Sequence, residues 1–429
     1  MTYEETLDFL YSRLPMFQRI GSAAYKVGLD TSLALSQMYG DPHRAYRTIH
    51  VAGTNGKGST SHTLAAILQQ SGYKVGLYTS PHLVDFRERI RVNGEKISRD
   101  YVIGFVQKYL GQNAQLTPSF FELTMMMAFD YFRAEKVDVA VIEVGLGGRL
   151  DSTNIISPDL SIITNISFDH TQFLGNTLPK IASEKAGIIK PKTPVVIGSA
   201  EGDVKEVFVQ KAQKENAEII FAQGTYECQR DAEGRWQVNT PEFGTITAEL
   251  QGECQAENCL TIINAVKQLL GLGYTITPEA VREGFAHVCS LTGLMGRWMK
   301  IGQKPLRICD TGHNVGGIAH IVEQLQKERT GVLRVIIGFV NDKDVTHILE
   351  MMPKDAVYYF TQAQLPRALD ARKVKEQASR FGLQGDTYAS VPEAYKAATE
   401  QATEDDFIYI GGSTFIVADL LAGIDYECK

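Results

Sequence analysis

The chain has 429 residues, which exceeds the roughly 250–300 at which single hydrophobic cores stop growing, so two domains are expected. Its 43 Lys and Arg against 50 Asp and Glu give a formal net charge of -7 without long runs of one sign, which argues against a nucleic-acid or membrane surface. No stretch approaches about 18 uninterrupted apolar residues, and the N-terminus lacks a basic segment followed by an apolar one, so a cytoplasmic protein is expected.

A strand, a glycine-rich loop and a helix follow one another within residues 48–70. The first 45 residues before them are expected to form helices around a short polar segment at residues 25–30. Residues 48–51 alternate as a strand does, and residues 60–70 carry apolar side chains at helical spacing. Between them, closely spaced glycines let the backbone turn sharply and bring its N–H groups against a phosphate chain, at a helix N-terminus that already favours anions.

Lys57 and Ser59 give this loop its expected chemistry. Lys57 adds a mobile positive charge for the outer phosphates, and Ser59 offers a hydroxyl to a metal ion. The common pattern G-x-x-x-x-G-K-[ST] is not met, because Val51 stands where its first glycine belongs and Gly58 separates the lysine from the hydroxyl. A tight turn with a solvated lysine is the competing interpretation, but the strand before the loop and the helix after it favour phosphate binding.

A second strand, predicted at residues 74–79, ends at Ser80. Beyond it Arg87, Arg89 and Arg91 alternate with other residues, which predicts either a solvated strand face or a clamp for an anionic substrate. The helix that opens at Phe120 is rich in methionine and phenylalanine, which is expected of a helix buried in the core.

Two further apolar strands are each followed by a chemically useful side chain. Residues 137–144 form a nearly unbroken apolar run, typical of a parallel strand covered on both faces, and carry Glu143 near its end. Residues 160–166 form another such strand, and His170 follows it shortly. A helix at residues 178–188 and a strand at residues 194–198 continue the alternation.

Strands that alternate with helices in this way predict a doubly wound parallel sheet, whose ligands lie beyond the carboxyl ends of the strands. Lys57, Ser80, Glu143 and His170 each fall at or just past the end of a different predicted strand. A hydroxyl, a carboxylate and an imidazole are workable ligands beside phosphate oxygens, although imidazole is an unusual choice for so hard a cation as magnesium. Together these residues predict a magnesium–nucleotide site; taken singly, Glu143 could be a buried structural acid and His170 a satisfied loop histidine.

The remaining sequence predicts an appendage and a second domain. Short alternating runs between residues 217 and 250 indicate a small antiparallel appendage, and a helix is expected from about residue 256 to 270. A domain boundary is placed at residues 293–296. Beyond it strands are expected at residues 306–309, 332–337, 356–360 and 407–410, which define a second, smaller α/β domain with Asp310 and His313 after its first strand. The cleft between the two domains is the expected site. The six cysteines lack any Cys-x-x-Cys pair, so free thiols are expected.

These motifs, in this order, resemble folylpolyglutamate synthase / dihydrofolate synthase of the Mur ligase superfamily, nearly from end to end. The motifs that carry the resemblance are residues 53–59, 78–82, 143–148, 169–170, 184–187, 310–314 and 342–344. The resemblance implies an N-terminal P-loop ATPase-like domain over residues 1–295, with the appendage at about 217–250, and a Rossmann-like α/β domain over residues 296–429.

The resemblance also implies roles for individual residues. Implied nucleotide-binding residues are Gly53, Thr54, Asn55, Gly56, Lys57, Gly58, Ser59, Asn258, Arg297 and Asp310, with His313 near the phosphates. Implied magnesium ligands are Ser59, Ser80, Glu143, His170 and a carbamylated Lys185, and two ions are expected. Implied substrate contacts are Gly28, Leu29, Phe121, Glu122, Leu150, Asp151 and Ser152. Lys57, His170, Lys185, Arg297 and His313 would serve catalysis. Two departures from the family pattern are Thr311-Gly312, in place of Gly-Ala, and Met299, where an acid is usual.

The implied activity is ligation of L-glutamate to the carboxylate of dihydropteroate, of reduced folates or of both, by a monomeric enzyme. ATP would convert the carboxylate to an acyl phosphate, which the glutamate amine attacks with release of phosphate; ADP is the other product. A Mur-type ligase of cell-wall synthesis is the first alternative, but such enzymes usually carry an extra N-terminal domain for which 45 residues leave little room. A non-catalytic ATP-binding regulator is the second, and the intact Lys57, Glu143, His170 and Lys185 argue against it.

Overall fold

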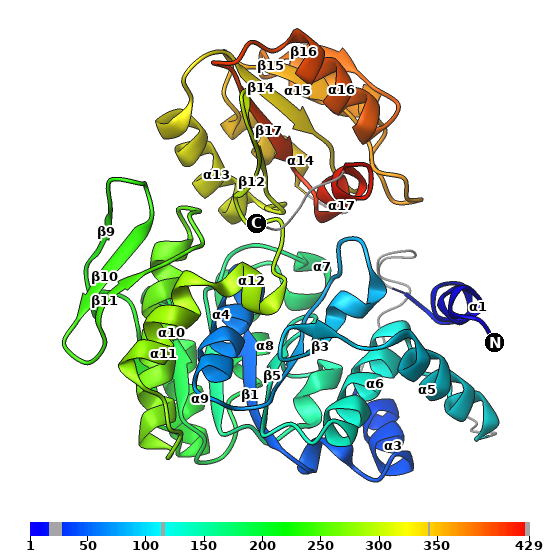
Figure 1. Ribbon diagram of the computed structural model, residues 1–429, viewed down its shortest axis with the longest axis vertical. Helices are drawn as coiled ribbons and strands as arrows, with labels where there is room; N and C mark the ends of the chain where they lie inside the picture. Colours follow the sequence, from blue (N-terminus) through cyan, green and yellow to red (C-terminus); the bar gives the residue numbers. More distant parts are fainter. Residues whose placement is uncertain (17–27, 113–115, 342–343, 425–429) are drawn as a thin grey trace. The chain divides into compact units, whose positions relative to one another are not determined.

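The computed structural model describes residues 1–16, 28–112, 116–341 and 344–424 (Figure 1). The chain forms two compact units. Unit 1 comprises Met1–Glu249 and Ala256–Gly293, and unit 2 comprises Leu250–Gln255 and Leu294–Lys429. The short excursion of residues 250–255 into unit 2 has no counterpart in the sequence pattern. Among the described residues, no helix is both long and apolar enough to cross a membrane, and Cys228, Cys254, Cys259, Cys289 and Cys309 are free thiols as expected.

Unit 1 is built on an eight-stranded sheet in the order β4-β3-β2-β5-β1-β6-β7-β8. In this order the six strands β2, β5, β1, β6, β7 and β8 pair in parallel, and β3 and β4 add an antiparallel edge beside β2. Their bounds are β1 Arg47–Ala52, β2 Val75–Tyr78, β3 Ile90–Val92, β4 Glu95–Lys96, β5 Val139–Glu143, β6 Leu160–Ile163, β7 Val195–Ile197 and β8 Ile219–Phe221. The central strands β1, β5 and β6 are almost completely buried, as their unbroken apolar runs predict.

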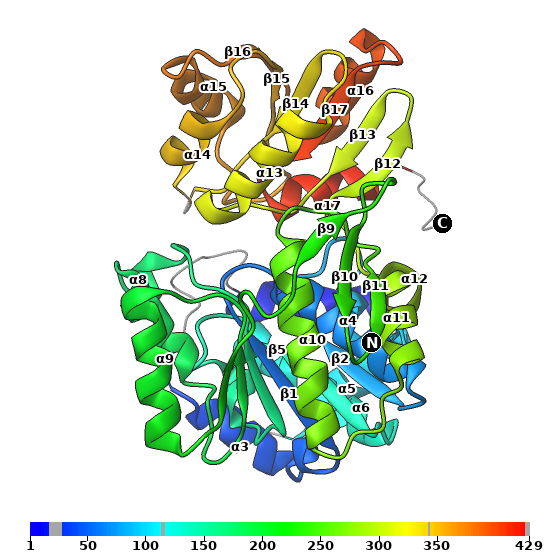
Figure 2. The same cartoon turned by 90° about the vertical axis from the view of Figure 1, so that its left-hand side faces the viewer.

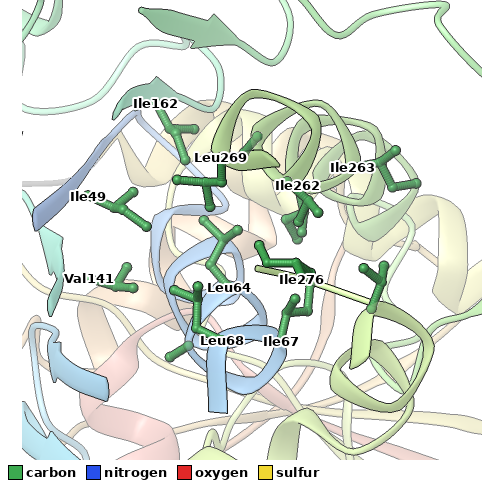
Figure 3. Close-up of a cluster of buried hydrophobic side chains, with 14 of the residues drawn as sticks. Ile49, Leu64, Ile67, Leu68, Val141, Ile162, Ile262, Ile263, Leu269 and Ile276 are labelled. Atoms are coloured by element: carbon green, nitrogen blue, oxygen red, sulfur yellow. The ribbon is translucent and has the colours of Figure 1, made fainter. Parts of the chain in front are cut away.

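Helices cover both faces of this sheet. On one face α4, α10 and α11 pack on β1, β5 and β6 around Ile49, Leu64, Val141 and Ile262 (Figures 2 and 3). On the other face α6 supplies a row of methionine and phenylalanine side chains, which confirms it as a core helix. The helical segments of unit 1 are α1 Tyr3–Asp8, η1 Phe9–Arg13, α3 Asp30–Met38, η3 Pro42–Arg44, α4 Lys57–Gln70, η4 Phe86–Arg89, α5 Arg99–Gly111, α6 Phe120–Ala134, η5 Ser152–Ile155, α7 Thr171–Leu174, α8 Leu178–Ala186, α9 Gly202–Glu215, α10 Gln255–Gly271, α11 Pro278–Ala286 and α12 Val288–Thr292.

The antiparallel appendage is a three-stranded sheet of β9 Cys228–Arg230, β10 Trp236–Thr240 and β11 Gly244–Thr247. Its first turn closes with the Gly234 N–H donating to the Asp231 carbonyl at 3.1 Å, as the hairpin signal predicts. The prediction was wrong at its N-terminal limit, because residues 219–221 form β8, a parallel edge strand of the large sheet, rather than part of the appendage. A three-residue apolar run is equally compatible with a strand of the appendage and with an edge strand of the large sheet.

Unit 2 contains a six-stranded sheet in the order β12-β13-β17-β14-β15-β16, parallel except for β12. Its strands are β12 Met299–Gln303, β13 Leu306–Cys309, β14 Leu333–Ile337, β15 Val357–Phe360, β16 Gln384–Thr387 and β17 Phe407–Gly411, and its helices are α13 Val315–Glu328, α14 Val345–Met351, α15 Ala371–Ser379, α16 Val391–Gln401 and α17 Thr414–Ala422. The four apolar strands are those predicted. The two edge strands, β12 and β16, are mostly polar and therefore escaped the hydrophobic pattern.

Close packing of α11 on α4 depends on Gly284. A Cβ built at this position would lie 2.6 Å from Cα and 2.7 Å from the backbone nitrogen of Ile67. We expect Gly284→Ala to lower the free energy of unfolding by about 2–3 kcal/mol, because backbone atoms cannot move aside as a side chain can. The matched control is Gly104→Ala in α5, where an added Cβ meets nothing within 4 Å and should stabilise the helix by about 1 kcal/mol. Urea unfolding of both variants measures the difference, and equal stability would contradict this account of the packing.

Candidate active site

The glycine-rich loop runs from the end of β1 to the first residue of α4. Gly53 and Gly56 have φ angles of 143° and 82°, a region that favours glycine. A Cβ at Gly53 would collide with the Thr164 side chain, and one at Gly56 with the side chain of Asn258 in α10. The helix begins at Lys57, three residues earlier than predicted, so the loop leads directly into its first-turn N–H groups. Such a loop is built to approach an anion with its backbone.

Lys57 and Lys185 converge on one carbonyl oxygen of this loop. The Lys57 Nζ donates to the carbonyls of Gly53 and Thr54, both at 3.1 Å. Lys185 comes from α8, is only 4% exposed and donates to the Gly53 carbonyl at 2.9 Å. Burial, reinforced by the charge of Lys57, lowers the pKa of Lys185 to about 7 although two nearby carboxylates oppose the shift. A large fraction of this amine is therefore neutral near neutral pH.

The ends of β2 and β5 bring Ser80 and Glu143 together. In the sheet, Glu143 lies opposite Val51 and Ile142 lies opposite Tyr78, so the strands end at the same edge. The backbone N–H of Ser80 donates to Oε2 of Glu143 at 2.8 Å. Glu143 is buried, and a buried carboxylate must be balanced by hydrogen bonds or by a cation.

The segment that follows β6 is tied to the glycine loop. The N–H of Thr54 donates to the carbonyl of Asn165 at 2.9 Å, and the N–H of Asn55 donates to its side-chain Oδ1 at 3.0 Å. At the end of this segment His170 directly precedes α7, with its own N–H donating to Oδ1 of Asp169 at 2.8 Å. Sequence reasoning missed Asn165 because the strand predicted for residues 160–166 includes it. Its signal was a pair of polar side chains, Thr164 and Asn165, directly after Ile162 and Ile163.

The donor set suits magnesium only together with a nucleotide. Within the ranges that the structure describes, no group of three or more His, Cys, Asp or Glu side chains could hold a metal ion by itself. Among the expected ligands, Glu143 and His170 are of these types, so the hydroxyls of Ser59 and Ser80 must contribute. Hydroxyl and carboxylate oxygens are ligands that magnesium prefers, and phosphate oxygens and water commonly fill its other positions. The residues therefore fit a nucleotide-dependent site rather than a preformed metal cage.

In unit 2, hydrogen bonds of the loop after β13 connect the site residues predicted for that unit. The carboxylate of the partly buried residue Asp310 accepts the backbone N–H of Trp298 at 2.7 Å and so fixes the segment that carries Arg297. Burial raises the pKa of Asp310, and the charge of Arg297 opposes this. Arg297 donates to the hydroxyl of Thr311, and His313 Nδ1 donates to the carbonyl of the same residue at 3.0 Å. Thr311, one of the departures from the family pattern, thus contacts both predicted catalytic residues of this unit.

Two predicted substrate residues are engaged within the fold. Glu122 completes a capping box at the start of α6, where its Oε2 accepts from the N–H and the hydroxyl of Ser119 at 2.7 and 2.8 Å. Asp151 caps η5 by accepting the N–H of Thr153 at 3.0 Å, and it accepts the N–H of Leu146 at 2.7 Å. Both carboxylates therefore hold backbone in place, which sequence reasoning did not anticipate.

The other predicted substrate residues are more accessible. Phe121 is half-buried, with its ring centroid 5.9 Å from that of Tyr78. Leu150 and Ser152 flank Asp151 and are partly exposed, as are Gly28 and Leu29 before α3. Residues 25–27 of the polar segment predicted beside them, and residues 342–343 of the last family motif, lie outside the described residues.

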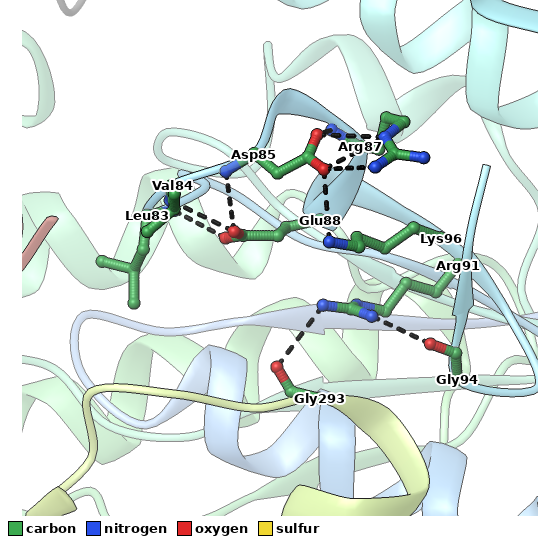
Figure 4. A network of polar contacts seen from close by, with 9 residues as sticks. All are labelled: Leu83, Val84, Asp85, Arg87, Glu88, Arg91, Gly94, Lys96 and Gly293. Atoms are coloured by element: carbon green, nitrogen blue, oxygen red, sulfur yellow. Dashed lines mark hydrogen bonds and ion pairs between the residues drawn. The ribbon is translucent and has the colours of Figure 1, made fainter. Parts of the chain in front are cut away.

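The three alternating arginines do not form a solvated face. Arg87 pairs with Asp85 at 2.6 Å and Arg91 donates to the Gly94 carbonyl at 2.8 Å (Figure 4). Arg89 is completely buried, at 1% exposure. The expectation of a solvated strand was wrong because η4 turns Arg89 inward and β4 covers the edge of β3.

Comparison with known proteins defines the class first. Residues 51–266 match the Mur ligase middle domain, and residues 296–414 match the Mur ligase glutamate ligase domain. The chain is 30% identical to the dihydrofolate synthase/folylpolyglutamate synthase of Escherichia coli, over 97% of this chain and 96% of that protein, and 31% identical to the folylpolyglutamate synthase of Lacticaseibacillus casei, over 86% and 87%. It therefore belongs to the folylpolyglutamate synthase/dihydrofolate synthase family.

Other relatives differ in length, and solved structures agree in fold. The chain is 32% identical to a probable bifunctional folylpolyglutamate synthase/dihydropteroate synthase of Haloferax volcanii, but it spans only 50% of that protein. The structure of Escherichia coli FolC in complex with DHPP and ADP matches with a TM-score of 0.86 at 28% identity, covering 98% of this chain and 97% of that one. The Mycobacterium tuberculosis folylpolyglutamate synthase complexed with ADP matches with a TM-score of 0.87 at 30% identity, covering 99% of each chain. The predicted α/β fold and family are thereby confirmed.

Proposed function

We propose that this protein ligates L-glutamate to the carboxylate of dihydropteroate and of reduced folates, converting ATP to ADP and phosphate. The observation that carries the proposal is the convergence of Lys57 and Lys185 on the Gly53 carbonyl, at the edge of the sheet where Ser80 and Glu143 meet. One sheet edge thus combines the glycine-rich loop, the Lys57 ammonium, the Lys185 amine and the buried Glu143 carboxylate. This combination suits phosphoryl transfer to a bound carboxylic acid.

In the first step a carboxylate oxygen of the substrate attacks the γ-phosphorus of ATP, ADP leaves, and an acyl phosphate forms. Negative charge spreads over the transferring oxygens, and Lys57 neutralises part of it. The loop N–H groups at the start of α4 hold the phosphates by the same principle. In the structure the Lys57 ammonium is bonded to the carbonyls of Gly53 and Thr54, two residues of this same loop.

In the second step the neutral amine of L-glutamate attacks the acyl carbon, and inorganic phosphate leaves with the bonding electron pair. The amide forms once the attacking nitrogen has lost a proton. We assign the binding of divalent metal to Ser59, Ser80, Glu143 and His170, where such an ion supplies neutralisation of phosphate charge. Arg297, Asp310 and His313 are proposed to contact the nucleotide from unit 2.

Lys185 is proposed to be carbamylated. Its neutral amine would add to carbon dioxide and lose one proton, which gives a carbamate anion. The pKa of about 7, caused by burial and by Lys57, favours this reaction because only the neutral amine is nucleophilic. A carbamate would also replace a cation that repels Lys57 with an anion that attracts it, and its oxygen suits a magnesium ion.

Activity on two carboxylate donors is expected. ADP should form with dihydropteroate and with a reduced folate at rates within about tenfold of each other, and in both cases only when L-glutamate is present. The reason is that both donors share the pterin ring, for which Phe121 and residues 145–152 are the proposed wall, and the Escherichia coli relative carries both names. A coupled assay of ADP release measures this, with a UDP-linked cell-wall precursor as the negative control. Activity with folates alone would reduce the proposal to a folylpolyglutamate synthase, and release of ADP independent of both donors would refute it.

A further inference from the structure

Three buried polar side chains form a hydrogen-bonded chain behind the site. His50 lies in β1, three residues before Gly53, and its Nε2 is 2.9 Å from Oγ1 of Thr153 in η5. The Thr153 hydroxyl donates to Oδ1 of Asp151 at 2.5 Å, and the N–H of Thr153 donates to the same oxygen at 3.0 Å. His50 and Thr153 are completely buried, and Asp151 nearly so.

The direction of each bond in this chain is fixed by chemistry. The Asp151 carboxylate accepts backbone N–H groups, so it also accepts the hydrogen bond from the Thr153 hydroxyl. That bond uses the single hydroxyl proton of Thr153. The Thr153 oxygen must then accept a proton from His50, which requires the Nε2–H tautomer. Burial, helped by the charge of Lys190, lowers the pKa of His50 to about 3, so the ring stays neutral. Its Nδ1 has no hydrogen-bond partner in the described part of the chain, a cost that the bond through Nε2 offsets.

Asp151 connects this hydrogen-bonded chain to the turn that follows β5. Its second oxygen accepts the N–H of Leu146 at 2.7 Å, three residues after Glu143. The neighbouring Gly145 packs so closely on the Phe121 ring that a Cβ there would collide with it. The orientation of one carboxylate therefore sets the position of both the turn and the aromatic side chain proposed to contact the pterin ring.

We propose that His50 and Thr153 are positioning residues for the pterin end of the carboxylate substrate, acting through Asp151. The proposal rests on the proposed function, since it assumes that Phe121 and residues 145–152 line that end of the site. Neither residue touches the phosphate-binding loop through the hydrogen bonds described. Their loss should therefore weaken binding of the pterin substrate and leave ATP binding unchanged.

Thr153→Val tests this, because valine keeps the branched shape and removes the hydroxyl. We expect the KM for dihydropteroate to rise about tenfold, with kcat and the KM for ATP unchanged within about twofold. Thr153→Ser, which restores the hydroxyl, should recover the wild-type KM. An equal rise in both KM values, or a serine variant no better than the valine one, would overturn the proposal in favour of a general structural role.

A second pair of variants covers the case in which Thr153→Val does not fold. His50→Gln retains an N–H donor near the Nε2 position, whereas His50→Leu removes it. The glutamine variant should keep a KM for dihydropteroate at least about fivefold lower than the leucine variant. Equal values would contradict the chain of hydrogen bonds.

Nitrogen NMR of the histidine-labelled protein gives a readout that does not depend on turnover. The signal lost in His50→Gln identifies His50, which should show a neutral ring with the proton on Nε2 from pH 5 to pH 8. A ring that titrates in this range, or one protonated on Nδ1, would refute the inference even if the enzyme ligates folates. Conversely, wild-type protein without folate-dependent ADP release would refute the proposed function while leaving the NMR result intact.

Discussion

Lys57→Ala is expected to lower turnover by at least about 1000-fold while the protein remains folded. Among the described residues, the Lys57 ammonium donates hydrogen bonds to the carbonyls of Gly53 and Thr54, and Lys57 is not part of the hydrophobic core around β1 and α4, so its removal costs the fold little. In the proposed reaction it neutralises negative charge on the transferring phosphate. Steady-state ADP release measures the loss, and circular dichroism with thermal unfolding measures the fold.

Lys74→Ala is the matched control for this substitution. Lys74 lies in the same unit and pairs with Glu135 at 2.8 Å on the surface, so its loss should change turnover by less than about twofold. A folded Lys57→Ala protein with the turnover of the Lys74 variant would remove Lys57 from the mechanism.

Lys185→Ala is expected to lower turnover by at least about 100-fold, and a short carboxylic acid in the buffer should restore part of it. The expected cause is loss of the carbamate, for which an added carboxylate can substitute. Lys180→Ala, which changes an exposed lysine of the same helix, is the control and should be silent. Carbamylation itself can be followed with carbon-13 bicarbonate, as a labelled carbonyl that is present in wild type and absent from Lys185→Ala.

The pH dependence of this modification follows from the lowered pKa of Lys185. Because the pKa falls from 10.5 to about 7, the folded amine begins to lose its proton near pH 7, whereas an exposed lysine does so near pH 10. Carbamate formation at fixed dissolved carbon dioxide should therefore increase between pH 6 and pH 8. A wild-type protein that is fully active without any labelled carbonyl would contradict the assignment.

The sequence predicted the sheet edge well because one rule governs it. Residues that directly follow parallel strands meet at one edge, and Ser80 and Glu143 do so at hydrogen-bonding distance. The rule requires no knowledge of side-chain packing. The rule also placed Asp310 and His313 on one loop of unit 2. There Asp310 accepts the N–H of Trp298, next to Arg297, and His313 bonds to the carbonyl of Thr311.

The sequence alone did not reveal the structural roles of charged residues that can serve either the fold or a ligand. Glu122 follows Ser119 at the spacing of a capping box, and that structural use is the one observed. Arg89 was predicted to lie on an exposed strand, because the alternation of charged and other residues does not reveal whether another strand or turn covers that strand. Asp151 holds the backbone of a turn whose conformation no local pattern specifies.

Transfer of oxygen-18 tests the central claim most directly. Dihydropteroate labelled with oxygen-18 in its carboxylate would be incubated with ATP and L-glutamate, and the inorganic phosphate released would be analysed by mass spectrometry. If the carboxylate attacks the γ-phosphorus, one labelled oxygen moves into phosphate for each amide formed. Amide formation with unlabelled phosphate would contradict the acyl phosphate and the account built on it.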